Sequence, residues 1–120
     1  TAVLNAEKEQ LVEMAALCDG QVIFYAQDEQ NPAIVRHRAE GGRVVFVRDQ
    51  HIVMAQIGGF ESRCLNLAGA AVQKLAQADS IAETTRVLLA VAATAWAMGI
   101  APELITAGIE TSDQAPKSVR

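Results

Sequence analysis

A chain of 120 residues, 51% hydrophobic and 20% charged, is long enough for one packed domain or for part of one. Its net charge of −4 and its 4% aromatic content argue against a nucleic-acid partner, because proteins that bind nucleic acids usually have a basic face and aromatic side chains on which bases stack. The longest apolar run, residues 87–98, is shorter than the ~20 residues that span a bilayer, so we expect no membrane association.

The first third of the chain predicts a strand, a helix and a second strand. A short apolar run at 2–4 is followed by Asn5, a favoured helix cap, and helical periodicity begins at Glu7. Gly20 ends the helix, and residues 22–25 form the second strand. Such a βαβ unit has parallel strands. The predicted buried face of the helix consists of Leu11, Met14, Ala15 and Cys18.

The middle of the chain predicts antiparallel pairing. Residues 27–32 form a polar loop, and residues 34–39 are interpreted as partly irregular. Two β-branched runs, 44–47 and 52–55, are separated by four polar residues and predict a β-hairpin. Gly58-Gly59 predicts a further turn, and Ser62 to Leu67 a third antiparallel strand.

The last third predicts two helices. Residues 83–98 are apolar nearly all round, which is typical of a helix packed on several sides, and Gly99 ends it. Pro102 begins a second helix, which extends to about Glu110. The expected fold is therefore α/β: a mixed sheet with a parallel βαβ start, an antiparallel hairpin and two carboxyl-terminal helices.

Few residues suggest chemistry. Neither glycine pair is followed by the Lys of a phosphate-binding loop, and His37 and His51 have no partners at metal-ligand spacing. We therefore assign no catalytic and no metal-binding residue. Asn5 and Glu7 are more informative, because they follow the carboxyl end of the first strand, where parallel sheets bind ligands. The alternative is that Asn5 only caps the helix.

The two cysteines, Cys18 and Cys64, have no nearby partners at metal-ligand spacing. Isolated thiols indicate a reducing, cytoplasmic setting, although one disulfide is an open alternative. The first residues also lack the basic and apolar regions of a secretory signal.

Several separated blocks, in order, resemble one family of amide ligases. The segment AVLNAE at residues 2–7 resembles the strand-to-helix turn of Mur-type ligases, where an Asn is followed two places on by acidic residues. The similarity is closer to the Mur-ligase-like carboxyl-terminal part of cyanophycin synthetases. This resemblance extends from residue 2 to about 111 except over 57–81, and no block is a catalytic signature. Its blocks are VEMA at 12–15, CDG at 18–20, VIF at 22–24, HRAEGGR at 37–43 and AWAMG at 95–99.

The resemblance implies an ATP-dependent ligase that activates a carboxylate as an acyl phosphate and joins it to an amine. In this family the Mur-like part adds arginine to aspartate side chains of a poly-aspartate-arginine polymer. ATP and Mg²⁺ would be cofactors of the whole enzyme, and none is expected for this chain alone. By position, the candidate cofactor-binding residues are Asn5, Glu7, Glu83 and Arg86.

The chain departs from the family pattern in two ways. The family's phosphate-binding loop precedes the segment that corresponds to Thr1, and its carboxyl-terminal ligase domain would follow Arg120. In addition, the Asn that faces adenine in the family falls at Val87, whose aliphatic side chain cannot make the hydrogen bonds of an amide. The acidic pair after Asn5 is reduced to Glu7, followed by Lys8. The adenine side is therefore expected to be degenerate.

The resemblance implies that residues 1–110 are part of a Mur-ligase-like central domain and that residues 111–120 are a linker or a disordered tail. Three hypotheses follow for the function of this chain. The first is a fragment that starts within a strand at Thr1, is inactive alone and works with the remainder of the ligase polypeptide. The second is a non-catalytic scaffold or self-associating module, and here we expect a homo-oligomer because open strand edges pair with other chains. The third is a residual nucleotide-binding domain.

Overall fold

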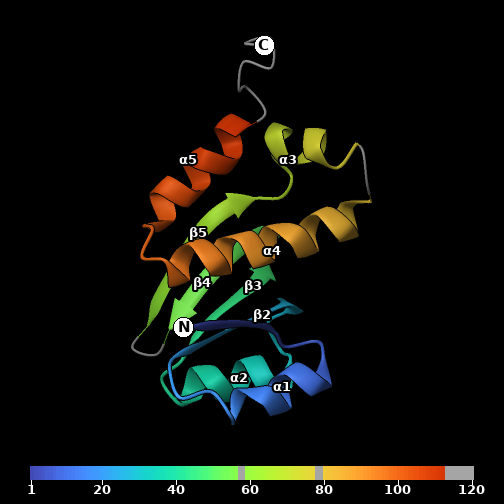
Figure 1. The fold of residues 1–120 in the computed structure, drawn as a ribbon. Helices are drawn as coiled ribbons and strands as arrows, with labels where there is room; N and C mark the ends of the chain where they lie inside the picture. The colour runs from blue at the N-terminus through green and yellow to red at the C-terminus, as the bar shows by residue number, and fades with distance from the viewer. Residues whose placement is uncertain (57–58, 78–79, 113–120) are drawn as a thin grey trace, which may run out of the picture.

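The computed structural model describes residues 1–56, 59–77 and 80–112. Within these ranges, five strands form one sheet in the order β1-β2-β3-β4-β5, and helices cover both of its faces (Figure 1). The strands are β1 (Ala2–Asn5), β2 (Val22–Asp28), β3 (Arg43–Arg48), β4 (His51–Gln56) and β5 (Phe60–Asn66). The helices are α1 (Glu9–Ala15), α2 (Pro32–Ala39), α3 (Ala70–Leu75), α4 (Ile81–Ala97) and α5 (Pro102–Ser112).

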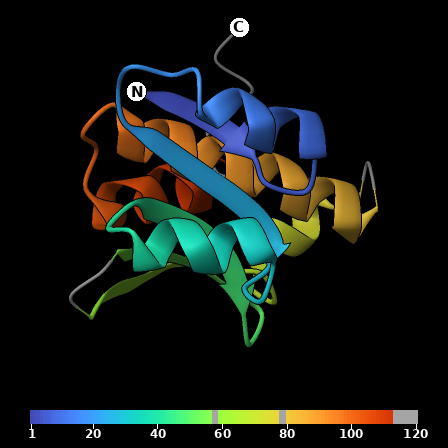
Figure 2. The ribbon, with the colours of Figure 1, turned by 90° about the horizontal axis from the view of Figure 1, so that it is seen from below.

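The first half of the sheet is parallel, and the sequence predicted this for β1 and β2 but not for β2 and β3. β1 pairs with β2 and β2 pairs with β3, both in parallel. The connecting helices α1 and α2 lie side by side on one face of the sheet (Figure 2). Helix α2 (Pro32–Ala39) differs from the sequence prediction, which gives residues 34–39 as partly irregular and 27–32 as a polar loop. Its only buried residues are Ala33 and Ile34 at its start, so its sequence lacks the apolar periodicity that reveals a surface helix.

Helix α1 differs from its prediction at its start and in its buried face. It begins at Glu9, its N-cap is Lys8, and no side chain caps it, so Asn5 is not the cap. Val12 and Ala15 pack against the core, whereas Met14 is 50% exposed. Cys18, expected on the buried face, lies beyond the end of the helix and is only partly buried.

The second half of the sheet is antiparallel, which confirms the predicted hairpin and third strand. β3 pairs with β4, and β4 pairs with β5. Asp49 and Gln50 connect β3 to β4, and both have positive φ angles, 51° and 60°. This conformation is a type I′ turn, whose twist matches that of the flanking strands. Gly58 of the predicted next turn lies outside the described residues.

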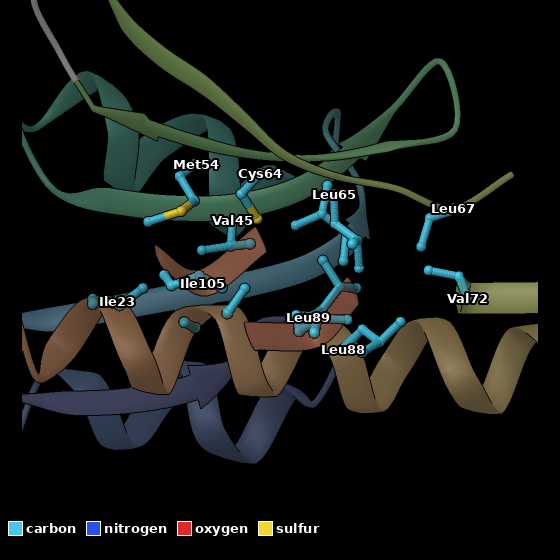
Figure 3. Close-up of a cluster of buried hydrophobic side chains, with 14 residues drawn as sticks. Ile23, Val45, Met54, Cys64, Leu65, Leu67, Val72, Leu88, Leu89 and Ile105 are labelled. Atoms are coloured by element: carbon cyan, nitrogen blue, oxygen red, sulfur yellow. The ribbon is translucent and has the colours of Figure 1, made fainter. Parts of the chain in front are cut away.

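The opposite face of the sheet packs on α3, α4 and α5. Side chains of β2 to β5 meet Leu88 and Leu89 of α4 and Ile105 of α5 in the larger hydrophobic core (Figure 3). Helix α4 buries one face only. The expectation that it packs on several sides is wrong, because Val87 is 58% exposed and Met98 73% exposed.

The remaining helices extend beyond the prediction. Helix α3 was not predicted, and it lies within residues 57–81, the stretch that the family resemblance does not cover. Val72 of α3 packs into the larger core. Helix α5 begins at Pro102 as expected and reaches Ser112, past the predicted end at Glu110. The rest of the predicted tail, 113–120, lies outside the described residues. None of the helices in the described ranges is long and apolar enough to cross a bilayer.

Candidate functional site

The candidate site lies where the parallel strands end. Asn5 is the last residue of β1 and stands opposite Tyr25 of β2 in the strand register. Helix α4 packs over these strands, and its first turns carry Glu83 and Arg86. We call Asn5, Glu7, Tyr25, Glu83 and Arg86 the carboxyl-edge cluster.

Asn5 holds the turn that follows β1. Its side chain is 8% exposed, and its Oδ1 accepts a hydrogen bond from the backbone N–H of Glu7 at 2.9 Å. This is an Asx turn, in which the short amide fixes the backbone two residues ahead. Glu7 in turn accepts a hydrogen bond at Oε2 from the backbone N–H of Gln27, just past Tyr25, at 2.8 Å. The two predicted residues thus tie the end of β1 to the end of β2.

Tyr25 connects this pair with α4. Burial raises the pKa of the Tyr25 hydroxyl, the Glu7 carboxylate raises it further, and the Arg86 guanidinium lowers it. Glu7 and Arg86 are therefore both close enough to act on the same hydroxyl. Arg86 also forms an ion pair with Glu83, one turn earlier on α4. The backbone N–H of Glu83 donates to Oγ of the N-cap Ser80 at 3.1 Å.

All four candidate residues thus lie at one edge of the sheet, as two bonded pairs. Asn5 is bonded to Glu7, Glu83 is paired with Arg86, and the charges of Glu7 and Arg86 both act on the Tyr25 hydroxyl. Val87, the position expected to face adenine, is exposed on the side of α4 turned away from the core. Its expected effect on nucleotide recognition stays a prediction.

A cavity of about 380 Å³ adjoins the cluster. It lies between the β3–β4 turn, the end of β2 and the starts of α3 and α4. We call it the amide pocket, because three of its lining residues carry carboxamides. It is lined by Gln27, Val47, Gln50, Leu67, Gln73, Ile81 and Thr85.

The sequence reasoning missed this pocket for a specific reason. The second strand was expected to end at Tyr25, whereas β2 continues to Asp28, which brings Gln27 to the carboxyl edge. Gln50 lies in the turn between two predicted strands, and Gln73 lies on a helix that was not predicted. The available signal was the rule that residues following parallel strands line ligand sites, applied to the second strand as well as the first.

Arg38, Arg43 and Arg48 are bonded to other side chains within the molecule. Arg48 forms ion pairs with Glu29 and Glu61, both at 2.8 Å, and Arg38 pairs with Glu61 at 2.9 Å. We call these four residues the α2–β5 network. Its two arginines lower the pKa of the Glu61 carboxyl to about 2, and its two carboxylates raise the pKa of Arg48.

Arg43 is held on the other side of the sheet. It donates to Oε1 of Gln21 at 2.9 Å and stacks its guanidinium on the Trp96 ring, 5.1 Å from the centroid. Trp96 in turn stacks on Phe60 at 6.0 Å. Arg38, Arg43 and Arg48 therefore all make contacts within the fold.

The histidines and cysteines have structural surroundings. His37 Nε2 lies 2.7 Å from the Val22 carbonyl oxygen, and its ring meets the Phe24 ring edge to face. Cys18 and Cys64 are both free thiols, and burial raises the pKa of Cys64 to about 11. Within 1–56, 59–77 and 80–112, no group of three or more His, Cys, Asp or Glu side chains could hold a metal ion.

Comparison of the sequence with models of known protein families gives no match, and comparison with curated proteins finds no relative.

Proposed function

We propose that this chain is the carboxyl-terminal part of the central ATP-binding domain of a Mur-type amide ligase, of the cyanophycin synthetase kind. In such a ligase ATP converts a carboxylate to an acyl phosphate, and an amine displaces the phosphate to form the amide. The chain would supply the carboxyl-edge side of the nucleotide site. The remainder of the polypeptide would supply the phosphate-binding loop, which these 120 residues lack.

One observation carries this proposal: the residues chosen from the resemblance converge in space. Asn5 and Glu7 come from the start of the chain and Glu83 and Arg86 from its last third, yet they share the carboxyl edge around Tyr25. That edge is where α/β sheets bind nucleotides. Arg86 places a cation there, and arginine is the side chain best suited to bind phosphate.

The cluster does not by itself suit a magnesium ion. Glu7 is its only carboxylate besides Glu83, which is paired with Arg86, and one oxygen of Glu7 already accepts the Gln27 N–H. We therefore assign magnesium and the triphosphate contacts to the rest of the ligase. The residues of this chain would shape the carboxyl-edge side of the nucleotide site. Asn5 fixes the backbone at Glu7, Glu7 fixes the backbone at Gln27, and Arg86 would place a positive charge near the phosphates.

The test uses the product of the complete open reading frame that contains this segment. We expect it to release ADP in proportion to amide formed when given Mg-ATP, arginine and an aspartate-containing peptide. Replacing Arg86 with Gln should lower kcat/KM for ATP about tenfold, the equivalent of ~1.4 kcal/mol of lost charged hydrogen bonding. The matched control is Arg63→Gln on β5, whose nearest carboxylate, Asp49, lies 3.9 Å away, and this variant should act as wild type.

Two outcomes would overturn the proposal. One is a complete protein that releases no ADP with any such acceptor. The other is equal activity in the Arg86→Gln and Arg63→Gln variants, which would show that the carboxyl-edge cluster lies outside the site.

A second candidate function, a non-catalytic self-associating module, is favoured by the open edge of the sheet at β1. β1 is an edge strand without charged side chains, and Leu17 after α1 is 83% exposed. Such edges pair with other chains. Light scattering should then give a dimer or larger species that Val3→Lys dissociates. A strict monomer at high protein concentration would count against this function.

A further inference from the structure

The amide pocket has walls that are fixed by the backbone around it. Leu67 is the central residue: its N–H donates to the Gln50 carbonyl at 2.7 Å, and its carbonyl accepts Nε2 of Gln73 at 3.0 Å. These bonds tie the β3–β4 turn to α3. They also orient the Gln73 carboxamide, because its nitrogen is bound and its Oε1 remains as the acceptor. Gln27 is anchored by its own backbone N–H on Glu7.

The lining selects an uncharged ligand. None of the seven lining residues is ionisable, although charged side chains stand close by in the carboxyl-edge cluster. A charged ligand moved into this cavity would lose part of its hydration without gaining a counter-charge from the lining. The polar groups present are three carboxamides and the hydroxyl of Thr85, which is 7% exposed. Together they offer both donors and acceptors.

The lining also distinguishes between classes of uncharged ligand. No aromatic residue lines the pocket, so a nucleobase or a sugar ring would find no surface on which to stack. The apolar walls are aliphatic: Val47, Leu67 and Ile81. Carboxamides facing aliphatic side chains match a peptide bond that carries an aliphatic residue, since a peptide bond presents one donor and one acceptor.

We propose that the amide pocket binds one aliphatic residue of an uncharged peptide segment, through the two amide groups that flank it. A volume of about 380 Å³ is at the lower end of the ~300–1,000 Å³ of small-ligand sites, which suits one residue rather than a long segment. The proposal goes beyond the ligase function and does not depend on it, because the amino acids of that reaction are charged.

The test is an NMR titration of the ¹⁵N-labelled chain with N-acetyl-leucine N-methylamide, which carries one aliphatic residue between two amides. We expect saturable shifts of the Gln27, Gln50 and Gln73 signals, with a dissociation constant on the order of 1 mM for a ligand of this size. Free leucine tests a zwitterion, and adenosine tests a nucleobase. Neither should shift these signals at the same concentrations.

Variants locate the binding. Thr85→Val keeps the shape of the side chain and removes its hydroxyl, and Gln73→Leu removes the oriented acceptor. Each should weaken binding about tenfold, while the exposed Gln10→Leu on α1 should leave it unchanged. If Gln73→Leu disturbs α3, the affinity of Thr85→Val alone decides whether the pocket binds the ligand. The NMR spectrum of each variant shows whether it is folded.

Three results would overturn the proposal. They are the absence of saturable shifts with the blocked leucine, binding that Thr85→Val leaves unchanged, and shifts that adenosine produces equally well at Gln27, Gln50 and Gln73.

Discussion

Gly42 shows at the residue scale how closely this fold is packed at the start of β3. A Cβ placed on Gly42 would overlap the His37 ring. That ring is held by its hydrogen bond to the Val22 carbonyl and by its contact with Phe24, so it cannot move aside without losing both. Only glycine therefore fits between α2 and β3.

We predict that Gly42→Ala destabilises the protein by about 1–3 kcal/mol, the cost of overpacking with loss of the His37 bond. Urea unfolding curves measure this free energy. Gly20→Ala is the matched control, because a Cβ on Gly20 meets nothing within 4 Å, and its unfolding free energy should match wild type or exceed it slightly. Equal effects of the two substitutions would contradict the account.

The α2–β5 network predicts how the free energy of unfolding depends on pH. Arg48 and Arg38 lower the folded-state pKa of Glu61 to about 2, below that of an unfolded glutamate. A lowered pKa means that the ion pairs stabilise the fold fully above about pH 5 and that this stability is lost as pH falls through the folded pKa. These side chains are about one-third exposed, so solvent screens the pairs and their total contribution is only about 1 kcal/mol.

Between about pH 6 and pH 3, the wild type should therefore lose roughly 0.5–1 kcal/mol more unfolding free energy than Glu61→Gln. Urea denaturation at both pH values measures the difference. Glu13→Gln, an exposed glutamate on α1, should track the wild type. An acid sensitivity in Glu61→Gln equal to that of wild type would show that the network contributes nothing.

At the residue scale, the sequence pointed to part of the site. Asn5 and Glu7 were identifiable because they follow an apolar run directly, and the structure places them at the carboxyl edge. The role of Asn5 as a helix cap was wrong, because its carboxamide bonds Glu7 two residues on rather than a helical N–H. Of the three carboxamides of the amide pocket, that of Gln27 could have been found from its place at the end of the second strand, whereas those of Gln50 and Gln73 could not, since glutamines in turns and on helices are ordinarily solvated.

At the scale of elements, the capping of α1 and α2 differs in a way that sequence alone did not reveal. Asn31 caps α2: its Oδ1 accepts from Ala33 N–H at 2.9 Å and from Ile34 N–H at 3.4 Å, and its Nδ2 donates to the Ala6 carbonyl. Lys8, the N-cap of α1, provides no such bond. The start of α2 therefore depends on one side chain, and the start of α1 does not.

We predict that Asn31→Ala costs about 1–2 kcal/mol of unfolding free energy, the usual loss for a cap with two acceptor bonds. Lys8→Ala should change it by less than about 0.5 kcal/mol, as for an exposed site without such features. Thermal and urea unfolding of the two variants test the contrast. A similar cost for both substitutions would mean that the Asn31 bonds do not hold α2.

Elements with strong periodicity or β-branched runs were predictable, and those without them were not. The hairpin β3–β4 followed from two such runs around four polar residues. Helix α2 carries three basic residues in its last turn and buries only its first two apolar ones, so its pattern is weak. Helix α4 was recognised, but its all-round apolar sequence concealed that one side, with Val87, faces away from the core.

At the scale of the whole molecule, the two edges of the sheet differ. β5 carries Glu61 and Arg63 and is contacted by α5, where the Thr106 hydroxyl donates to the Cys64 carbonyl. Charge and covering helices are the usual protection of an edge strand. β1 has neither charge nor proline, so this edge is the one where the sheet would continue if the chain belongs to a larger domain.

Hydrogen exchange tests this continuation. The N–H groups of Ala2 and Ala6 donate to carbonyls of β2 and its preceding residue, so the alternation along the strand turns the Val3 N–H outward. We predict that Val3 exchanges rapidly in this chain and at least about 100-fold more slowly in the product of the complete open reading frame. Val45, in the central strand β3, should be protected in both. Rapid exchange of Val3 in both proteins would indicate that no strand is added at β1.

The most direct test of the ligase proposal is calorimetric titration with Mg-ATP of this chain and of the complete gene product. If the chain supplies only one side of the nucleotide site, the complete protein should bind saturably and the chain alone should give no heat of binding at millimolar nucleotide. A complete protein that binds no Mg-ATP would contradict the proposal, and so would tight binding by these 120 residues alone.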